Sequence, residues 1–256
     1  MLLAIDVGNT NIYFGLFDGD ELVYHFRCAS VVGRTADELA VFVLQMISLR
    51  GMDFRSISAV VTASVVPPLT DTVIGFARRY CDDEPVVVGP GTRTGMPVLC
   101  DNPREVGADR IINALAAFET VKAGVIVVDF GTATTFDCVS NKGEYLGGAI
   151  CPGIQISAEA LYMRAARLTR VELAVPPRVV GRNTTQSMQS GIVFGYASLV
   201  DGMVSKIRLE LGFPCAVWAT GGLAALMEKL TSTIEHVDDQ LTLRGLRIVH
   251  ERNCSS

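Results

Sequence analysis

The stretch IDVGNTNIYFGLFDGDEL (residues 5–22) places an acid and a glycine-containing turn between two apolar runs. The run that leads into Asp6 predicts a buried strand, and the run after the turn at 8–10 predicts a second strand. The Asp-Gly pair at 18–19 is typical of a hairpin turn, so ELVYHFR is the expected third strand. Three consecutive strands therefore open the fold.

The same arrangement returns in VIVVDFGTATTFDCVSNKGEYLGGA (125–149). Asp129 again follows an apolar run, precedes a glycine-containing turn and begins a three-strand meander. An internal repeat of this kind indicates a duplicated architecture. We therefore predict an α/β protein of two similar lobes, 1–118 and 119–256, with a cleft between them and the last helix packing back on the first lobe.

Helical spacing and strand-like runs fill the rest of the chain. Thr35 and Glu38 form a capping box, Asn102 can cap a helix that begins at Pro103, and Gly107 marks a break in that helix. Further strands are expected at 56–66, 85–89 and 216–222, and helices at 35–50, 67–80, 102–121, 154–166, 184–211, 224–230 and 241–251.

Composition excludes several classes of function. The chain has 256 residues, of which 49% are hydrophobic, which is enough for a sizeable core. The net charge is −5 without blocks of like charge, so neither nucleic acid nor an anionic membrane is an expected partner. No apolar run approaches the roughly 18–20 residues of a membrane span, and the N-terminus lacks the basic region of a signal peptide. Seven scattered cysteines without a CxxC pair predict mostly buried, reduced thiols in a cytoplasmic protein.

The two Asp-containing turns carry groups that suit phosphate binding. Backbone N–H groups in a glycine-containing turn can point at phosphate oxygens, and Asp6 can hold Mg²⁺ or its water shell. An ordinary β-turn would explain one such motif equally well. The second turn adds three threonines (132, 134 and 135), although threonine is also a good strand residue. Two facing copies in a duplicated fold favour a phosphate clamp.

Other segments leave two interpretations open. Asp109 could be a general base or substrate anchor, or a carboxylate that complements a helix dipole. GGAICPG (147–153) predicts a strand-to-helix loop whose free N–H groups could bind an anion. The glycines of ATGG (219–222) could let the backbone approach a base or ribose.

Some site types have no matching pattern in the sequence. The three histidines lack metal-ligand spacing, and we expect His25 in a strand and His236 and His250 on the surface. Neither a Walker A loop nor a G-x-S-x-G elbow is present in the sequence.

The two Asp-x-Gly turns together with ATGG resemble the actin/Hsp70/sugar-kinase superfamily, whose duplicated ATP-binding lobes are ribonuclease-H-like. More narrowly, the chain resembles type III pantothenate kinases from residue 3 to about residue 248. The motifs that carry this resemblance are DVGNTN, SVVPPL, the TG of GTRTGMP, DNPREVGADR, DFGTATTFD, LGGAICPG and GRNTTQSMQSG.

The resemblance implies ATP-dependent phosphorylation of pantothenate to 4′-phosphopantothenate, the first step towards coenzyme A. It also implies a homodimer, with the helix that begins near Thr184 as part of the interface. The cofactors implied are Mg²⁺, which accompanies ATP at Asp6, and K⁺ or NH₄⁺, which corresponds to Asp129. Asp109 corresponds to the base that takes the proton of the substrate hydroxyl.

The same resemblance assigns binding residues. The implied ATP contacts are Asp6, Val7, Gly8, Asn9, Thr10, Asn11, Ile12, Tyr13 and Thr132, and the implied pantothenate contacts are Gly107, Ala108, Asp109, Arg110 and Thr184. Family members often have Tyr directly before the Asp-Asn-Pro triplet, where this chain has Cys100. A thiol does not reproduce the reach or the hydrogen bond of a phenol, which weakens the predicted substrate contact at Cys100.

Two alternatives stay open from sequence. One is a kinase or phosphatase of the same superfamily that acts on another small substrate, for a kinase another small alcohol, and the other is an ATP-binding regulatory or accessory protein without turnover. Asp109 separates the last from the enzymes, because a pure binding module has no need of a base.

Overall fold

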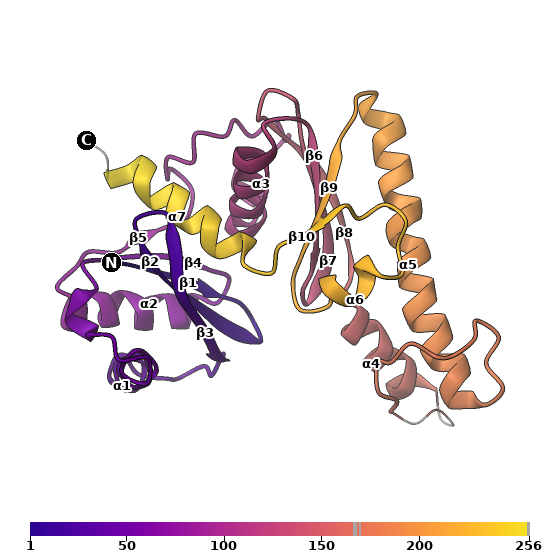
Figure 1. Cartoon of the computed structure of the whole chain (residues 1–256), viewed down its shortest axis with the longest axis horizontal. Coiled ribbons are helices and arrows are strands. Elements are labelled where there is room, and N and C mark those ends of the chain that lie inside the picture. Colours follow the sequence, from indigo (N-terminus) through magenta and orange to yellow (C-terminus); the bar gives the residue numbers. More distant parts are fainter. Residues whose placement is uncertain (166–167, 169, 255–256) are drawn as a thin grey trace. The chain divides into compact units, whose positions relative to one another are not determined.

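The computed structural model describes residues 1–165, 168 and 170–254. These residues form two compact units (Figure 1). The N-terminal unit consists of residues 1–96, 101–116 and 240–256, and the C-terminal unit consists of residues 97–100 and 117–239. Each unit contains one five-stranded sheet with helices.

The sheet of the N-terminal unit has the strand order β3-β2-β1-β4-β5. β1 pairs antiparallel with β2 and parallel with β4. The strands are β1 (Leu2–Val7), β2 (Asn11–Asp18), β3 (Glu21–Ala29), β4 (Ala59–Ser64) and β5 (Val86–Val87). The helices are α1 (Ala36–Ser48), α2 (Pro67–Phe76), α3 (Ala108–Val121), which runs into the C-terminal unit, and α7 (Leu241–Cys254).

The sheet of the C-terminal unit has the order β10-β9-β6-β7-β8. Its strands are β6 (Val125–Phe130), β7 (Ala133–Val139), β8 (Tyr145–Pro152), β9 (Ala216–Thr220) and β10 (His236–Val237). Its helices are α4 (Ile154–Arg164), α5 (Thr184–Leu211) and α6 (Ala224–Glu228).

The two sheets repeat one topology. Starting from β8, the second sheet reads β8-β7-β6-β9-β10, which matches β3-β2-β1-β4-β5 strand for strand. The pairing directions match as well, because β6 runs antiparallel to β7 and parallel to β9. The prediction of two duplicated α/β lobes is confirmed, and in each copy the aspartate lies near the carboxyl end of the central strand.

Alternation along the strands explains which face of each sheet is covered. In the N-terminal unit, Ile5, Val7 and Phe14 lie in an apolar cluster with residues of α1 and α2. The other face meets α7, which contacts β1, β2 and β4. In the C-terminal unit, alternate residues of β6, β7 and β9 pack with α4 and α5. Because side chains in a strand alternate, Asp6 and Asp129 lie on the faces opposite these apolar clusters.

Several predicted element boundaries differ from the structure. The predicted break at Gly107 in the helix over 102–121 is confirmed, but the part before it is only a 3₁₀ turn over 103–105, and α3 begins at Ala108. Asn102 does not cap a helix, and its amide Nδ2 instead donates to Glu105 Oε1 at 2.6 Å. The 85–89 strand shortens to two residues, and the two-residue strand β10 was not predicted because it is too short for a pattern. The predicted end of the helix over 154–166 lies outside the described residues.

Two predictions about exposure were wrong in part. Only Cys138 and Cys215 are buried, whereas Cys254 is exposed and the other four cysteines are half-buried. All seven are free thiols. His236 is exposed as predicted, but His250 is half-buried on α7. Burial lowers the pKa of His250 and outweighs the opposite effect of the carboxylates of Asp83 and Glu251.

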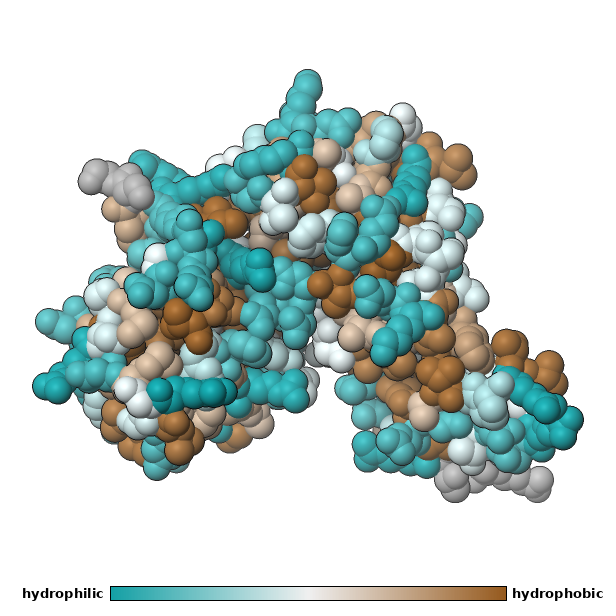
Figure 2. Space-filling model, in the orientation of Figure 1, coloured by the Kyte–Doolittle hydropathy of each residue, from teal (hydrophilic) through white to brown (hydrophobic). Residues whose placement is uncertain are grey.

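The surface is mixed in character, with apolar and polar residues interspersed on the face shown in Figure 2. Exposed apolar side chains include Val41 and Leu44 of α1 and Ile156 and Met163 of α4. Among the described residues, no helix is long and apolar enough to cross a membrane.

Candidate active site

The first predicted phosphate turn connects β1 and β2. The Gly8 N–H donates to Asn11 O at 3.0 Å, which closes the turn and leaves Asn9 and Thr10 exposed. The N–H groups of Asn9 and Thr10 make no hydrogen bond within the described part of the chain. N–H groups that are not used within such a turn are suitable donors to a phosphate oxygen.

Ser30 holds this turn from behind. It is the residue directly after β3, and its N–H donates to Thr10 O at 3.0 Å while its Oγ donates to Gly8 O at 2.6 Å. Both contacts satisfy carbonyl groups of the turn, so its N–H groups are held in a fixed orientation. The sequence alone does not indicate this role of Ser30, because serine is common in the loops that follow strands.

Asp6 lies one residue before the end of β1. It is half-buried, and its register partners are Tyr13 on the antiparallel side and Ala63 on the parallel side. Ligands of α/β sheets bind at the carboxyl ends of parallel strands, which is where this carboxylate lies. A carboxylate oxygen is the kind of ligand that Mg²⁺ prefers.

The second predicted phosphate turn connects β6 and β7 and is held in a similar way. The Gly131 N–H donates to Ala133 O at 3.0 Å, and the residue directly after β8, Gly153, donates its N–H to Thr132 O at 3.1 Å. A Cβ on Gly153 would overlap Thr132 O and lie 2.7 Å from Gly131 O. Only glycine therefore permits this contact.

The helix α4 begins at this turn. Gly153 is its N-cap residue, and no side chain caps the helix. The first N–H groups of a helix have no intrahelical partner and favour anions. The prediction that GGAICPG is a loop was wrong in one respect, since β8 continues to Pro152 and the helix follows at once.

The three threonines of the second turn do not share one environment. Thr132 is exposed in the turn, whereas Thr134 and Thr135 belong to β7 and point to opposite faces of the sheet. The Thr134 hydroxyl is fully buried without a hydrogen-bond partner in the described structure. The idea that all three cradle a phosphate was therefore wrong, and Thr132 is the one that the turn presents.

Asp129 packs against Gly221, the first of the two glycines that follow β9. A Cβ on Gly221 would lie 2.6 Å from Asp129 Oδ1 and 2.7 Å from Phe130 O, and Gly221 has a φ of +90°. Both the space and the backbone angle require glycine here. A Cβ on Gly222, in contrast, would meet no atom of the described structure within 4 Å, so of the two glycines only this one borders open space.

Asp109 is the second residue of α3 and is half-buried. Its Oδ1 accepts a hydrogen bond from the Arg110 N–H at 2.9 Å. A Cβ on Gly107 would lie 2.5 Å from that same oxygen, so the carboxylate folds back over the glycine. The helix N-terminus also favours a negative charge at this position.

Cys100 and Thr184 belong to the C-terminal unit. The Cys100 Sγ lies 3.7 Å from the position of a Cβ on Gly147, and the preceding residue, Leu99, donates its N–H to Tyr145 O at 2.8 Å. Thr184 is the exposed first residue of α5, whose N-cap is Asn183. Asn183 Oδ1 accepts from the Gln186 N–H at 2.9 Å, so the hydroxyl of Thr184 is not used as the cap.

A comparison with protein families finds that residues 2–206 match the family described as type III pantothenate kinase. The chain belongs to the type III pantothenate kinase family. A type III pantothenate kinase of Myxococcus xanthus is 56% identical over 256 residues, with full coverage of both chains. One from Anaeromyxobacter sp. is 55% identical over 253 residues, which cover 99% of this chain and all of the relative.

Solved structures show the fold of this pantothenate kinase family member. A Campylobacter jejuni protein described as a conserved Baf family transcriptional activator has a TM-score of 0.61 at 20% identity, with 99% of this chain and 100% of that chain covered. The activator of 2-hydroxyisocaproyl-CoA dehydratase from Clostridium difficile has a TM-score of 0.54 at 13% identity, with 99% and 96% covered. These likenesses agree with the duplicated actin-like ATPase fold.

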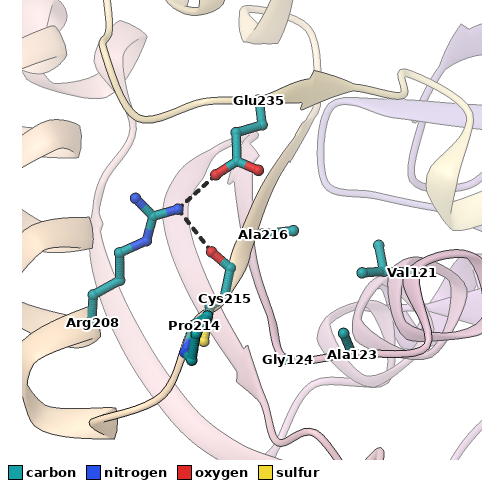
Figure 3. Close-up of a pocket in the computed structure, with 8 residues that line it drawn as sticks. All are labelled: Val121, Ala123, Gly124, Arg208, Pro214, Cys215, Ala216 and Glu235. Atoms are coloured by element: carbon teal, nitrogen blue, oxygen red, sulfur yellow. Dashed lines mark hydrogen bonds and ion pairs between the residues drawn. The ribbon is translucent and has the colours of Figure 1, made fainter.

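A cavity of about 420 Å³ lies at the other end of the strands in this family member (Figure 3). It is lined by residues that precede β6 and β9, with Arg208 of α5 donating from Nη2 to Glu235 Oε1 at 2.6 Å and to Cys215 O at 2.7 Å. Burial raises the pKa of the Cys215 thiol, and the Arg208 charge opposes this only in part. None of the predicted site residues lines this cavity.

Proposed function

We propose that this protein transfers the γ-phosphoryl group of ATP to the 4′ hydroxyl of pantothenate, which gives 4′-phosphopantothenate in the first step of coenzyme A synthesis. Membership of the type III pantothenate kinase family over the whole chain length, at 56% identity to a relative of that name, carries this proposal. The two glycine-containing turns and the carboxylates described above are consistent with phosphoryl transfer, which mainly needs positioning of the reactants and neutralisation of the phosphate charge.

ATP is assigned first to the turn of the N-terminal unit. The segment from Asp6 to Tyr13 contains the half-buried carboxylate and the N–H groups of Asn9 and Thr10, which are not used within the described part of the chain, and it would hold the phosphates. The carboxylate of Asp6 fits Mg²⁺ or its water shell, since hard oxygen ligands suit this ion. Thr132 contributes a further ATP contact, supported by its exposure in the equivalent turn and by the uncapped N-terminus of α4.

Pantothenate is assigned to the start of α3, with Asp109 as the general base. Gly107, Ala108 and Arg110 surround Asp109 in sequence, and the close approach of Gly107 fixes where the carboxylate lies. Asp109 would orient the substrate hydroxyl and accept its proton as the bond to phosphorus forms. Thr184 is a proposed further substrate contact, and Cys100 is a weaker one because its thiol replaces a phenol.

A monovalent cation, K⁺ or NH₄⁺, is assigned to Asp129. The donors present fit such an ion, because Asp129 lies between two hydroxyl-bearing residues, Thr135 and Thr220, that are its register partners on the neighbouring strands. The cation would supply positive charge near the phosphates. The protein's part is to hold that charge at a fixed position through the contact of Asp129 with Gly221.

We further propose that the protein is a cytoplasmic homodimer, with α5 as part of the interface. The seven free cysteines support a reducing compartment. Sedimentation equilibrium tests the oligomeric state, and a single species of monomer mass over the micromolar range would contradict the dimer.

The decisive experiment measures ADP release by the purified protein with MgATP, KCl and pantothenate, beside a panel of other small alcohols. Phosphorylation of pantothenate is expected to be the fastest of these reactions, and a faster reaction with another alcohol would reassign the substrate.

Asp109→Asn should lower turnover by roughly 10²–10⁴-fold, the usual contribution of a general base, with ATP binding retained. Asp71→Asn, an exposed carboxylate on α2, is the matched control. Equal rates in wild type and Asp109→Asn would remove Asp109 from the base role.

A further inference from the structure

The sheet of the C-terminal unit carries a row of oxygen atoms on its polar face. Register places Thr135 of β7 and Thr220 of β9 directly opposite Asp129 of β6. Paired residues of neighbouring strands point to the same face, with Cβ atoms close enough for their side chains to interact. The side chains of these three residues therefore form one row across three strands.

One of these side chains is held by a buried carboxylate. Asp137, two residues after Thr135 on the same face, is fully buried. Its Oδ2 accepts a hydrogen bond from Thr135 Oγ1 at 3.0 Å, and its Oδ1 accepts one from the Tyr145 hydroxyl at 2.6 Å. Tyr145 is fully buried as well. Because a buried carboxylate requires hydrogen-bond donors, Asp137 fixes the direction of both hydroxyl protons.

The consequence for Thr135 is chemical. A threonine hydroxyl has one proton, so an oxygen that gives its proton to Asp137 offers only lone pairs to any other group. Within the described part of the chain, Thr135 Oγ1 has no second hydrogen-bond partner. An acceptor-only oxygen beside a carboxylate suits a cation, and it suits K⁺ and NH₄⁺ equally because both need acceptors.

We propose that Thr135 is a second protein ligand of the monovalent cation assigned to Asp129, and that Asp137 orients its hydroxyl for this purpose. The inference rests on the proposed function, from which it takes the cation. Asp137 acts through Thr135, and Tyr145 acts through Asp137, so both are positioning residues. Such second layers typically change metal affinity by about 10–100-fold when they are removed.

Cation binding can be measured without turnover. Thermal unfolding is recorded with Mg²⁺ and the non-hydrolysable analogue ADPNP, and KCl is titrated against tetramethylammonium chloride at constant ionic strength. Because a ligand of the folded state raises Tm, wild type and Thr135→Ser should show a K⁺-specific rise. Thr135→Val should need about tenfold more K⁺ for the same rise, and the K⁺ concentration that half-activates ADP release should increase by a similar factor.

The neighbouring Thr134 provides a matched control. Thr134→Val makes the same atomic change on the same strand, but its hydroxyl lies on the opposite, apolar face and has no partner in the described structure. Its K⁺ response should stay within about twofold of wild type. An equal loss in Thr134→Val and Thr135→Val would mean that strain in β7 causes the effect, which overturns the proposal.

Asp137→Asn tests the orienting role. With the amide oxygen accepting from Tyr145, the amide N–H₂ faces Thr135 and turns the hydroxyl proton towards the cation. The K⁺ requirement should then rise by at least about threefold. A normal response in Asp137→Asn beside an altered one in Thr135→Val would overturn this role.

A wild-type K⁺ response in Thr135→Val would overturn the proposal that Thr135 is a ligand of the cation. The absence of any K⁺-specific rise in the Tm of wild type would overturn it as well. Thr135→Ala carries the same prediction with a smaller side chain if the valine variant does not fold. The thermal assay contains no pantothenate. A failure to phosphorylate pantothenate would therefore contradict the proposed substrate without affecting the interpretation of the K⁺-dependent Tm.

Discussion

The carboxylate of Asp109 lies over the Cα of Gly107, so close that a Cβ at position 107 would be 2.5 Å from Oδ1. The position of the proposed base therefore depends on a residue without a side chain. A larger residue at 107 would push the carboxylate away, although it would leave the charge of Asp109 and the helix α3 in place.

Gly107→Ala should accordingly lower kcat by at least about tenfold, because misplacing a reacting group by a fraction of an ångström is costly. ADP release measures the loss, and binding of a fluorescent ATP analogue should change by less than about threefold. Gly75→Ala on α2 is the control, since its Cβ would lie at an ordinary 3.5 Å from Ala36 Cβ. That variant should gain about 0.5–1 kcal/mol of stability with unchanged turnover. Full activity in Gly107→Ala would show that the contact does not position Asp109.

Ser30→Ala removes the hydroxyl that donates to Gly8 O at 2.6 Å and keeps the backbone hydrogen bond to Thr10 O. We expect a loss of about 1 kcal/mol in the free energy of unfolding, the usual contribution of one hydrogen bond. The KM for ATP should rise several-fold, because the N–H groups of the turn lose their fixed orientation. Urea unfolding and initial rates test both, and Ser58→Ala serves as a surface control. A raised KM for pantothenate alone would argue against this role of the turn.

Gly153→Ala should be far more damaging than Ser30→Ala. The added methyl group would overlap Thr132 O, which is backbone and cannot rotate away. The turn or the start of α4 must shift, and we expect a destabilisation of about 2–4 kcal/mol, in the range of overpacking and backbone strain. Thermal unfolding gives the stability, and ATP binding measured on the folded fraction gives the effect on the turn. A variant as stable as wild type would show that the close approach of Gly153 is not required.

Asp201 provides a prediction about pH. Burial alone would raise the pKa of this carboxyl, but hydrogen bonds from the backbone and hydroxyl groups of Ser232 and Thr233 outweigh it and lower the pKa below 3.8. A lowered pKa in the folded state contributes stability above the unfolded value, and this contribution is lost as the pH falls through the folded pKa.

Asp201→Asn should therefore be destabilised by about 1–2 kcal/mol at pH 7, and the difference from wild type should shrink as the pH falls below the ordinary pKa of aspartate, about 3.9. Urea unfolding across this range measures it, with Asp71→Asn as the control. A difference that stays constant with pH would show that the charge of Asp201 contributes nothing.

The repeat was predictable because it depends on local pattern. The apolar runs that end at Asp6 and Asp129, and the glycines that follow, were enough to predict two copies of one topology. The break at Gly107 was also visible, because glycine weakens a helix. In contrast, β10 consists of His236–Val237 alone and depends on pairing with β9. Two residues are too few to show a strand pattern in the sequence.

The details of the site depend on contacts between segments far apart in sequence. Nothing near Ser30 indicates that it reaches back to Gly8, and nothing in DFGTATTFD distinguishes Thr134, which faces the apolar core, from Thr135, which donates to Asp137. That distinction needs the strand boundaries, because a shift of one residue exchanges the two faces. Roles of individual residues in ATP or pantothenate binding stay predictions.

Both turns are held by the residue directly after the third strand of their sheet, through an N–H that donates to the carbonyl of a threonine. The two copies leave different room for change during evolution. Position 30 supports its turn partly through a side chain, so several hydroxyl or amide residues could take its place and adjust the turn gradually. Position 153 admits no side chain at all, and α4 begins there. A change in the conformation of the second turn therefore requires a matching change at the start of α4, so the turn and the helix should evolve together.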